Sequence, residues 1–120
     1  MAKKINSKNR VAISFGSLDP NELKGVVRDG LVSMTISDRE EFIRALETEM
    51  RRASLNMRLY LIPLGIPGRS PEDLTPTEVG HLIRYLKINV PQAMPAIEQA
   101  LAGYSIFAEK SGPYADPLAA

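Results

Sequence analysis

The sequence contains no cysteine, and this absence excludes disulfide bonds, thiolate metal ligands and a cysteine nucleophile. It is compatible with a reducing compartment, so we expect a cytoplasmic protein. The longest apolar run begins at Leu59, is interrupted by Pro63, and falls far short of the roughly 20 residues that span a bilayer. The first residues also lack the apolar run of a secretory signal. We therefore expect no membrane insertion.

Histidine is nearly absent as well, because His81 is the single copy. A lone histidine supplies neither a serine-based triad nor a metal site, since both need several convergent side chains. Paired carboxylates occur at three places, but all lie in charged stretches where a general acid would stay solvated. These pairs are Glu40 and Glu41, Glu47 and Glu49, and Glu72 and Asp73. We expect no catalytic residue, no metal and no cofactor, and hence a protein that binds and does not catalyse.

Charge of one sign is not in excess, because 15 lysines and arginines face 14 acidic residues, for a net charge of +1. A net charge this small produces no long-range electrostatic attraction to nucleic acid, so any basic surface patch must be local. The composition is otherwise that of a globular protein, with 44% hydrophobic and 24% charged residues. We expect a flexible basic arm over residues 1–10, a single globular domain over residues 11–110, and a flexible tail over residues 111–120.

The pattern of apolar residues predicts a mainly α domain of about four helices with one to three short strands. Residues 11–15 alternate as a half-buried strand does, with Val11, Ile13 and Phe15 on one face. A helix begins after Asp19, which forms a capping box with Glu22, and Gly30 is expected to end it. Residues 31–36 fit either a strand or a helical link, which leaves open an α+β sheet or a nearly all-helical bundle.

Three further helices are predicted from capping residues and from apolar side chains at three- and four-residue steps. Ser37 is expected to cap the first, Thr75 to cap the second, and residues 91–110 to contain the third, with Pro95 in its first turn or bending it. Their predicted buried faces are, in chain order, Phe42, Ile43, Leu46, Met50 and Ala53; Val79, Leu82, Ile83 and Leu86; and Met94, Ile97, Leu101, Tyr104 and Ala108.

Residues 59–68, LYLIPLGIPG, are apolar but contain two prolines and two glycines, so a helix cannot continue through them. They indicate either a short buried strand that leads into a turn or a hydrophobic loop. The glycines at 65 and 68 are typical of a turn.

Residues 10–53 resemble the ribbon-helix-helix family of DNA-binding proteins. The resemblance lies in the strand RVAISF, the capped helix DPNELKGVVRDG and a second helix, ISDREEFIRALETEM. It implies that two chains pair their strands into a ribbon that reads the major groove, and that the second helix holds a phosphate at its N-terminus. The nucleic-acid contacts that it implies are Lys3, Lys4, Lys8 and Arg10 in the arm, Ala12 and Ser14 on the ribbon, and Ser37 at the phosphate.

The alternative is a protein–protein adaptor or assembly factor. The segment 59–68, together with Tyr104, Ile106 and Phe107, holds more apolar residues than a short loop and one helix face easily hide. The expected contacts are Leu59, Leu61, Leu64, Ile66 and Phe107, unless the three leucines simply complete the core. A homodimer is expected in either case, because a symmetric copy commonly covers a lone edge strand or excess apolar surface.

Overall fold

The computed structural model describes residues 15–110, with side chains for residues 15–107. Four long α-helices, α2 (Pro20–Val32), α3 (Ile36–Arg52), α4 (Pro76–Asn89) and α5 (Met94–Ala102), are followed by the short α6 (Ser105–Lys110). The 3-10 helices are η1 (Met57–Leu61), η2 (Pro71–Asp73) and η3 (Pro91–Ala93). The mainly α class is confirmed, and the described residues contain no strand.

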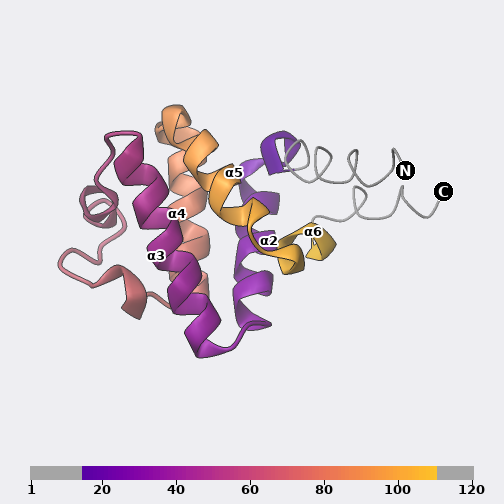
Figure 1. Ribbon diagram of the computed structural model, residues 1–120. Coiled ribbons are helices and arrows are strands. Elements are labelled where there is room, and N and C mark those ends of the chain that lie inside the picture. Colours follow the sequence, from indigo (N-terminus) through magenta and orange to yellow (C-terminus); the bar gives the residue numbers. More distant parts are fainter. Residues whose placement is uncertain (1–14, 111–120) are drawn as a thin grey trace.

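The helices pack in pairs around one core. α2 makes its largest contact with α4, α3 packs on α5, and α6 returns to α2 and α5 (Figure 1). The segment between α3 and α4 contacts both of those helices and forms the left edge of the molecule in Figure 1. Within residues 15–110, no helix is both long and apolar enough to cross a bilayer.

Two helix starts confirm the prediction from capping residues. The Asp19 carboxylate accepts a hydrogen bond from the Glu22 N–H at 2.9 Å, and the Glu22 carboxylate accepts one from the Asp19 N–H at 3.1 Å. Thr75 and Glu78 form the same reciprocal box at the start of α4. Each box satisfies two backbone donors that a helix N-terminus would otherwise leave unpaired.

Gly30 does not end α2, which corrects the prediction. The helix continues through Leu31 to Val32, and the side chain of Leu31 is fully buried. A glycine inside a helix costs about 1 kcal/mol, whereas burying a leucine contributes about 1.5–3 kcal/mol. Burial therefore outweighs propensity, and the missing side chain lets the Phe107 ring pack against the Gly30 backbone.

The link between α2 and α3 is a short turn and contains neither a strand nor a continuous helix. Residues 31 and 32 finish α2, residues 33–35 turn, and Ile36 opens α3. The predicted cap Ser37 is wrong by two positions, because the Thr35 side chain accepts the hydrogen bond from the Asp38 N–H at 3.1 Å. Thr35 has the extended backbone of an N-cap, whereas Ser37 is already helical.

The single helix predicted within residues 91–110 is also wrong, because η3, α5 and α6 occupy this region. Pro95 lies in the first turn of α5, as expected, and the chain turns at Gly103 and Tyr104. The turn lets Tyr104 and Phe107 pack on Phe42 of α3, with ring centroids 5.6 and 5.1 Å away. Ring packing of this kind stabilises the turn over a straight helix.

The predicted strand at residues 11–15 is wrong at the one position that can be observed. Phe15 is helical and fully buried, while residues 11–14 lie outside the described part of the chain. Of the predicted α3 face, Phe42, Ile43, Leu46 and Met50 are buried. Ala53 is exposed, because it lies beyond the last turn as the C-cap.

Candidate functional site

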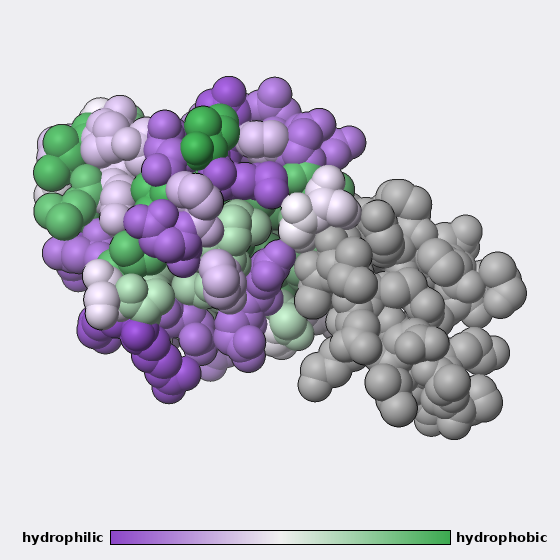
Figure 2. Space-filling model, turned by 90° about the horizontal axis from the view of Figure 1, so that it is seen from above, coloured by the Kyte–Doolittle hydropathy of each residue, from purple (hydrophilic) through white to green (hydrophobic). Residues whose placement is uncertain are grey.

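Leu59 and Ile62 are large aliphatic side chains that the fold leaves in solvent, with exposed fractions of 56% and 57%. We call them the exposed pair. η1 ends at Leu61, and the Ile62 N–H donates to the Leu59 carbonyl at 3.4 Å. Side chains three residues apart eclipse one another in a 3-10 helix, so the pair projects from one side of η1. Figure 2 shows hydrophobic side chains on the surface at this end of the molecule.

Two residues predicted for a protein contact belong to the core instead. Leu61 and Phe107 are fully buried, so neither offers a surface to a partner. Met57 and Leu61 fill the inner side of η1, which explains why Leu59 faces outward. Leu64 and Ile66 are half-buried and pack against the core while keeping part of their surface in solvent.

Residues 59–61 belong to η1 and residues 62–68 form turns, so the buried strand considered for residues 59–68 is excluded, and the predicted loop is confirmed only from residue 62 onward. The Gly65 N–H donates to the Ile62 carbonyl at 3.0 Å, and the Ile66 N–H donates to the Leu61 carbonyl at 3.1 Å. Gly65 and Gly68 both have φ of +80°, a conformation that side-chain-bearing residues adopt at a cost. The glycines therefore fix the path that brings Leu64 and Ile66 toward α4.

A hollow of about 380 Å³ lies between this turn and the first turns of α4. We call it the α4 groove, and its lining residues are Pro63, Leu64, Ile66, Glu78 and His81. Its volume falls within the range of small-ligand and peptide side-chain pockets. Three of its five lining residues are apolar, and the first of them, Pro63, directly follows Ile62 of the exposed pair in the chain.

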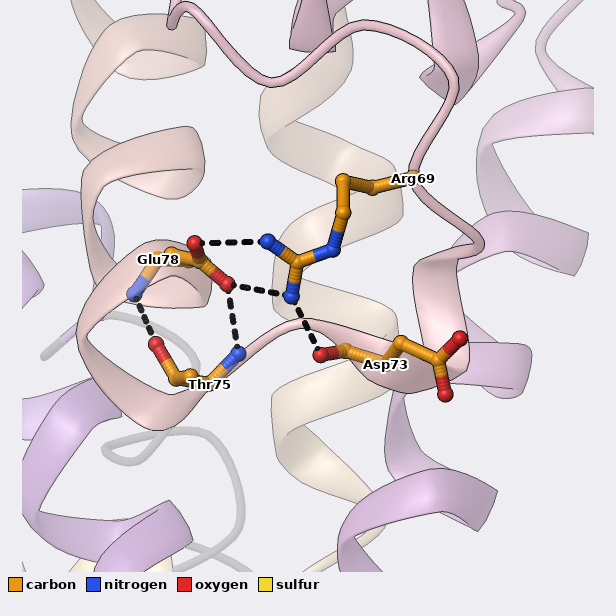
Figure 3. A network of polar contacts seen from close by, with 4 residues as sticks. All are labelled: Arg69, Asp73, Thr75 and Glu78. Atoms are coloured by element: carbon orange, nitrogen blue, oxygen red, sulfur yellow. Dashed lines mark hydrogen bonds and ion pairs between the residues drawn. The ribbon is translucent and has the colours of Figure 1, made fainter.

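Arg69 anchors the segment to α4 (Figure 3). Its guanidinium donates to both carboxylate oxygens of Glu78, at 3.0 Å each, and to the Asp73 carbonyl at 2.7 Å. The Thr75 N–H also donates to Glu78, at 2.8 Å. The Thr75 hydrogen bond lowers the pKa of Glu78 most, and the Arg69 guanidinium lowers it further against the effect of burial. A bidentate pair of this kind fixes geometry, so one wall of the groove is held in place.

His81 is exposed on α4, and its position beside the groove was not predicted. The sequence does not indicate that His81 lies beside the groove, because the groove forms where α4 meets residues 63–66, which are distant from His81 in the chain. Within residues 15–107, no group of three or more His, Cys, Asp or Glu side chains is placed to hold a metal.

The residues predicted to contact DNA lie almost entirely outside the described part of the chain, namely Lys3, Lys4, Lys8, Arg10, Ala12 and Ser14. Ser37 is described and is exposed in the first turn of α3, next to Asp38. DNA binding and the ribbon-helix-helix resemblance therefore stay predictions.

A second exposed apolar surface, which the sequence analysis missed, lies at the turn between α2 and α3. Val32 and Ile36 are 63% and 68% exposed. The nearby hollow of about 380 Å³ is lined largely by polar or small residues, with only Met34, Tyr104 and Ile106 as large apolar side chains. Burial raises the pKa of Tyr104, and the nearby Glu41 and Asp38 raise it further. This surface is more polar than the α4 groove, and one arginine hydrogen bond bridges its turn, from Arg39 Nε to the Leu31 carbonyl at 3.3 Å, whereas Arg69 donates three.

Comparisons of the chain with models of protein families, with curated proteins and with solved structures find no match.

Proposed function

We propose that this protein acts by binding and not by turnover, and that it captures a short apolar segment of a partner protein. The exposed pair and the α4 groove form the receiving surface. The observation that carries the proposal is the exposure of Leu59 and Ile62 beside an apolar hollow in a segment that Arg69 holds in place. A few side chains seated in well-packed, desolvated hollows carry most of the energy of such contacts.

The size of the surface suits a peptide better than a large globular interface. Fully burying an aliphatic side chain contributes about 1.5–3 kcal/mol, and each member of the exposed pair has about half of its surface left to bury. The pair together therefore contributes about 1.5–3 kcal/mol, whereas a micromolar complex needs about 8 kcal/mol, so contacts in the groove must supply most of the affinity. Preformed geometry removes the cost of ordering this side of the complex.

Selection of a displayed library of random 12-residue peptides tests the proposal. The wild-type protein is expected to enrich peptides with an aliphatic or aromatic anchor. Changing both members of the exposed pair to Asp is expected to weaken binding of a selected peptide at least tenfold, because two charges would lose hydration on binding. Circular dichroism should show unchanged helicity, since both side chains are exposed.

Ile36→Asp is the matched control, because Ile36 is at least as exposed but lies at the start of α3, where an acidic residue is tolerated. Equal binding by the wild type and the double Asp variant would refute the proposed surface. Sedimentation of the wild type and the double variant distinguishes a second copy of this chain as the occupant, since only then would the double variant change from dimer to monomer.

A further inference from the structure

A further hollow, of about 440 Å³, opens where α3 ends and η1 begins. We call it the arginine hollow, because Arg51 and Arg58 line it together with Glu47. Arg51 lies in the last turn of α3 and Arg58 is the second residue of η1. The hollow therefore adjoins the element that carries the exposed pair.

Both guanidiniums face a single carboxylate without hydrogen-bonding to it. The Glu47 Oε2 atom lies 3.9 Å from the nearest Arg51 nitrogen and 3.6 Å from Arg58 Nε. Among the described residues, neither guanidinium donates a hydrogen bond to protein, whereas Arg69 donates three. Arg69 is therefore committed to the fold, while the planar donor sets of Arg51 and Arg58 are available to a ligand.

The net charge of the arginine hollow is complementary to a ligand that carries one negative charge. Two guanidiniums and one carboxylate leave an excess of one positive charge, and the guanidiniums are accessible, with side chains 70% and 54% exposed. The Glu47 side chain is only 15% exposed. A monoanionic carboxylate would neutralise the hollow, whereas a dianion would exceed its charge.

The backbone around the hollow is fixed before any ligand arrives. α3 ends in a Schellman motif, in which the Leu55 N–H donates to the Met50 carbonyl and the Ser54 N–H to the Arg51 carbonyl, both at 2.9 Å. Ser54 takes the left-handed φ of +63° that this motif requires. The Asn56 side chain then caps η1 by accepting the Arg58 N–H at 3.1 Å. Both arginines therefore start from fixed backbone positions.

We propose that the arginine hollow binds an aspartate or glutamate side chain of the same partner segment whose apolar anchor occupies the exposed pair and the α4 groove. This inference rests on the proposed function and narrows the partner to an acidic, apolar motif. Arg58 and Leu61, the last residue of η1, are separated by about 6 Å at the rise of a 3-10 helix, and Ile62 follows directly. An extended peptide covers that distance in two to three residues, so its acidic residue should lie about two to four positions from its anchor.

Peptide selection on the wild type and on the Arg51→Gln/Arg58→Gln variant tests the motif. The wild type should enrich an acidic residue at this spacing, and the variant should keep the apolar anchor but lose the acidic preference. Replacing that residue by glutamine in a selected peptide should weaken wild-type binding about tenfold and leave binding to the variant unchanged. Arg52→Gln is the matched control, because Arg52 is a neighbour in sequence that pairs with Glu49 at 3.2 Å and does not line the hollow.

Wild-type selection of apolar peptides with no acidic preference would overturn this inference and leave the proposed function standing. If no peptide is selected, the proposed function fails. Carboxylate binding by the arginine hollow can then still be tested by nuclear magnetic resonance, with sodium acetate as the titrant and sodium chloride as the control. Acetate is expected to shift the backbone amides of residues 54–58 in the wild type and in Arg52→Gln, but not in the double variant. Glu47→Gln should bind acetate several-fold more tightly, because the competing carboxylate is gone. Shifts that chloride reproduces would overturn the carboxylate site.

Discussion

Replacing Gly30 by alanine probes how closely α2 and α6 approach. A Cβ atom at Gly30 would lie 2.4 Å from Phe107 Cε1 and 2.6 Å from Cδ1, well inside van der Waals contact. The Phe107 ring is fully buried and packs 5.1 Å from the Phe42 centroid, so it cannot swing into solvent. Either the ring or one of the two helices must shift.

Gly25 gives the matched comparison within the same helix. A Cβ atom there would meet nothing closer than an Arg28 side-chain nitrogen at 4.0 Å. Alanine stabilises a helix interior over glycine by about 1 kcal/mol, so Gly25→Ala should raise the free energy of unfolding by up to that amount. At Gly30 the same gain opposes an overpacking cost of about 1–3 kcal/mol. Because the clash is severe, we expect a net loss of about 1–2 kcal/mol.

Urea denaturation followed by circular dichroism measures both variants on one scale. In thermal unfolding, the melting temperatures of the two variants should change in opposite directions, by about 4–8 °C per kcal/mol for a domain of this size. A Phe107→Leu change in the Gly30→Ala background should cost less than Phe107→Leu alone, because the clash is relieved. If Gly30→Ala stabilises as Gly25→Ala does, the inferred packing of Phe107 on α2 is wrong.

Four other changes can be checked by the same unfolding assay. Leu61→Asp should destabilise by about 4 kcal/mol or more, because it places an unpaired charge in the core; a folded variant would contradict the burial of Leu61. Ser54→Gly should stabilise by up to about 1 kcal/mol, since φ is +63°. Glu78 has a lowered pKa, so its stabilisation is present above its ordinary value of 4.5 and is lost as pH falls through the folded pKa; Glu78→Gln should reduce this acid sensitivity. Burial raises the pKa of Glu98, so stability is lost as pH rises from 4.5 through the raised pKa, and Glu98→Gln should be more stable at neutral pH.

Features set by neighbouring residues were predictable from the sequence. The capping boxes at Asp19 and Thr75 involve residues three apart, and the apolar face of α4 repeats with the helical period. The errors arise where tertiary contacts outweigh local preference. Phe107 lies 77 positions after Gly30, so no local sequence pattern predicts that Phe107 packs on Gly30. The same holds at the turn before α6, which exists because two rings pack on Phe42.

The candidate site was predictable as a segment but not as a surface. Composition alone marked residues 59–68 as unusually apolar. Separating exposed Leu59 from buried Leu61 required knowledge of the 3-10 helix, whose period differs from the strand and α-helix patterns used for prediction. The Arg69–Glu78 pair joins residues nine apart across a turn. Its geometry depends on the path set by the glycines at 65 and 68.

The aromatic contact between α3 and α6 has a consequence for how the domain unfolds. α6 spans six residues, far fewer than the 12–15 that an isolated helix needs to be even marginally populated in water. Nucleation on its own is therefore negligible, and α6 depends on the burial of Phe107 against Phe42. Its helical state is consequently cooperative with that of the core, and α6 should melt together with α3.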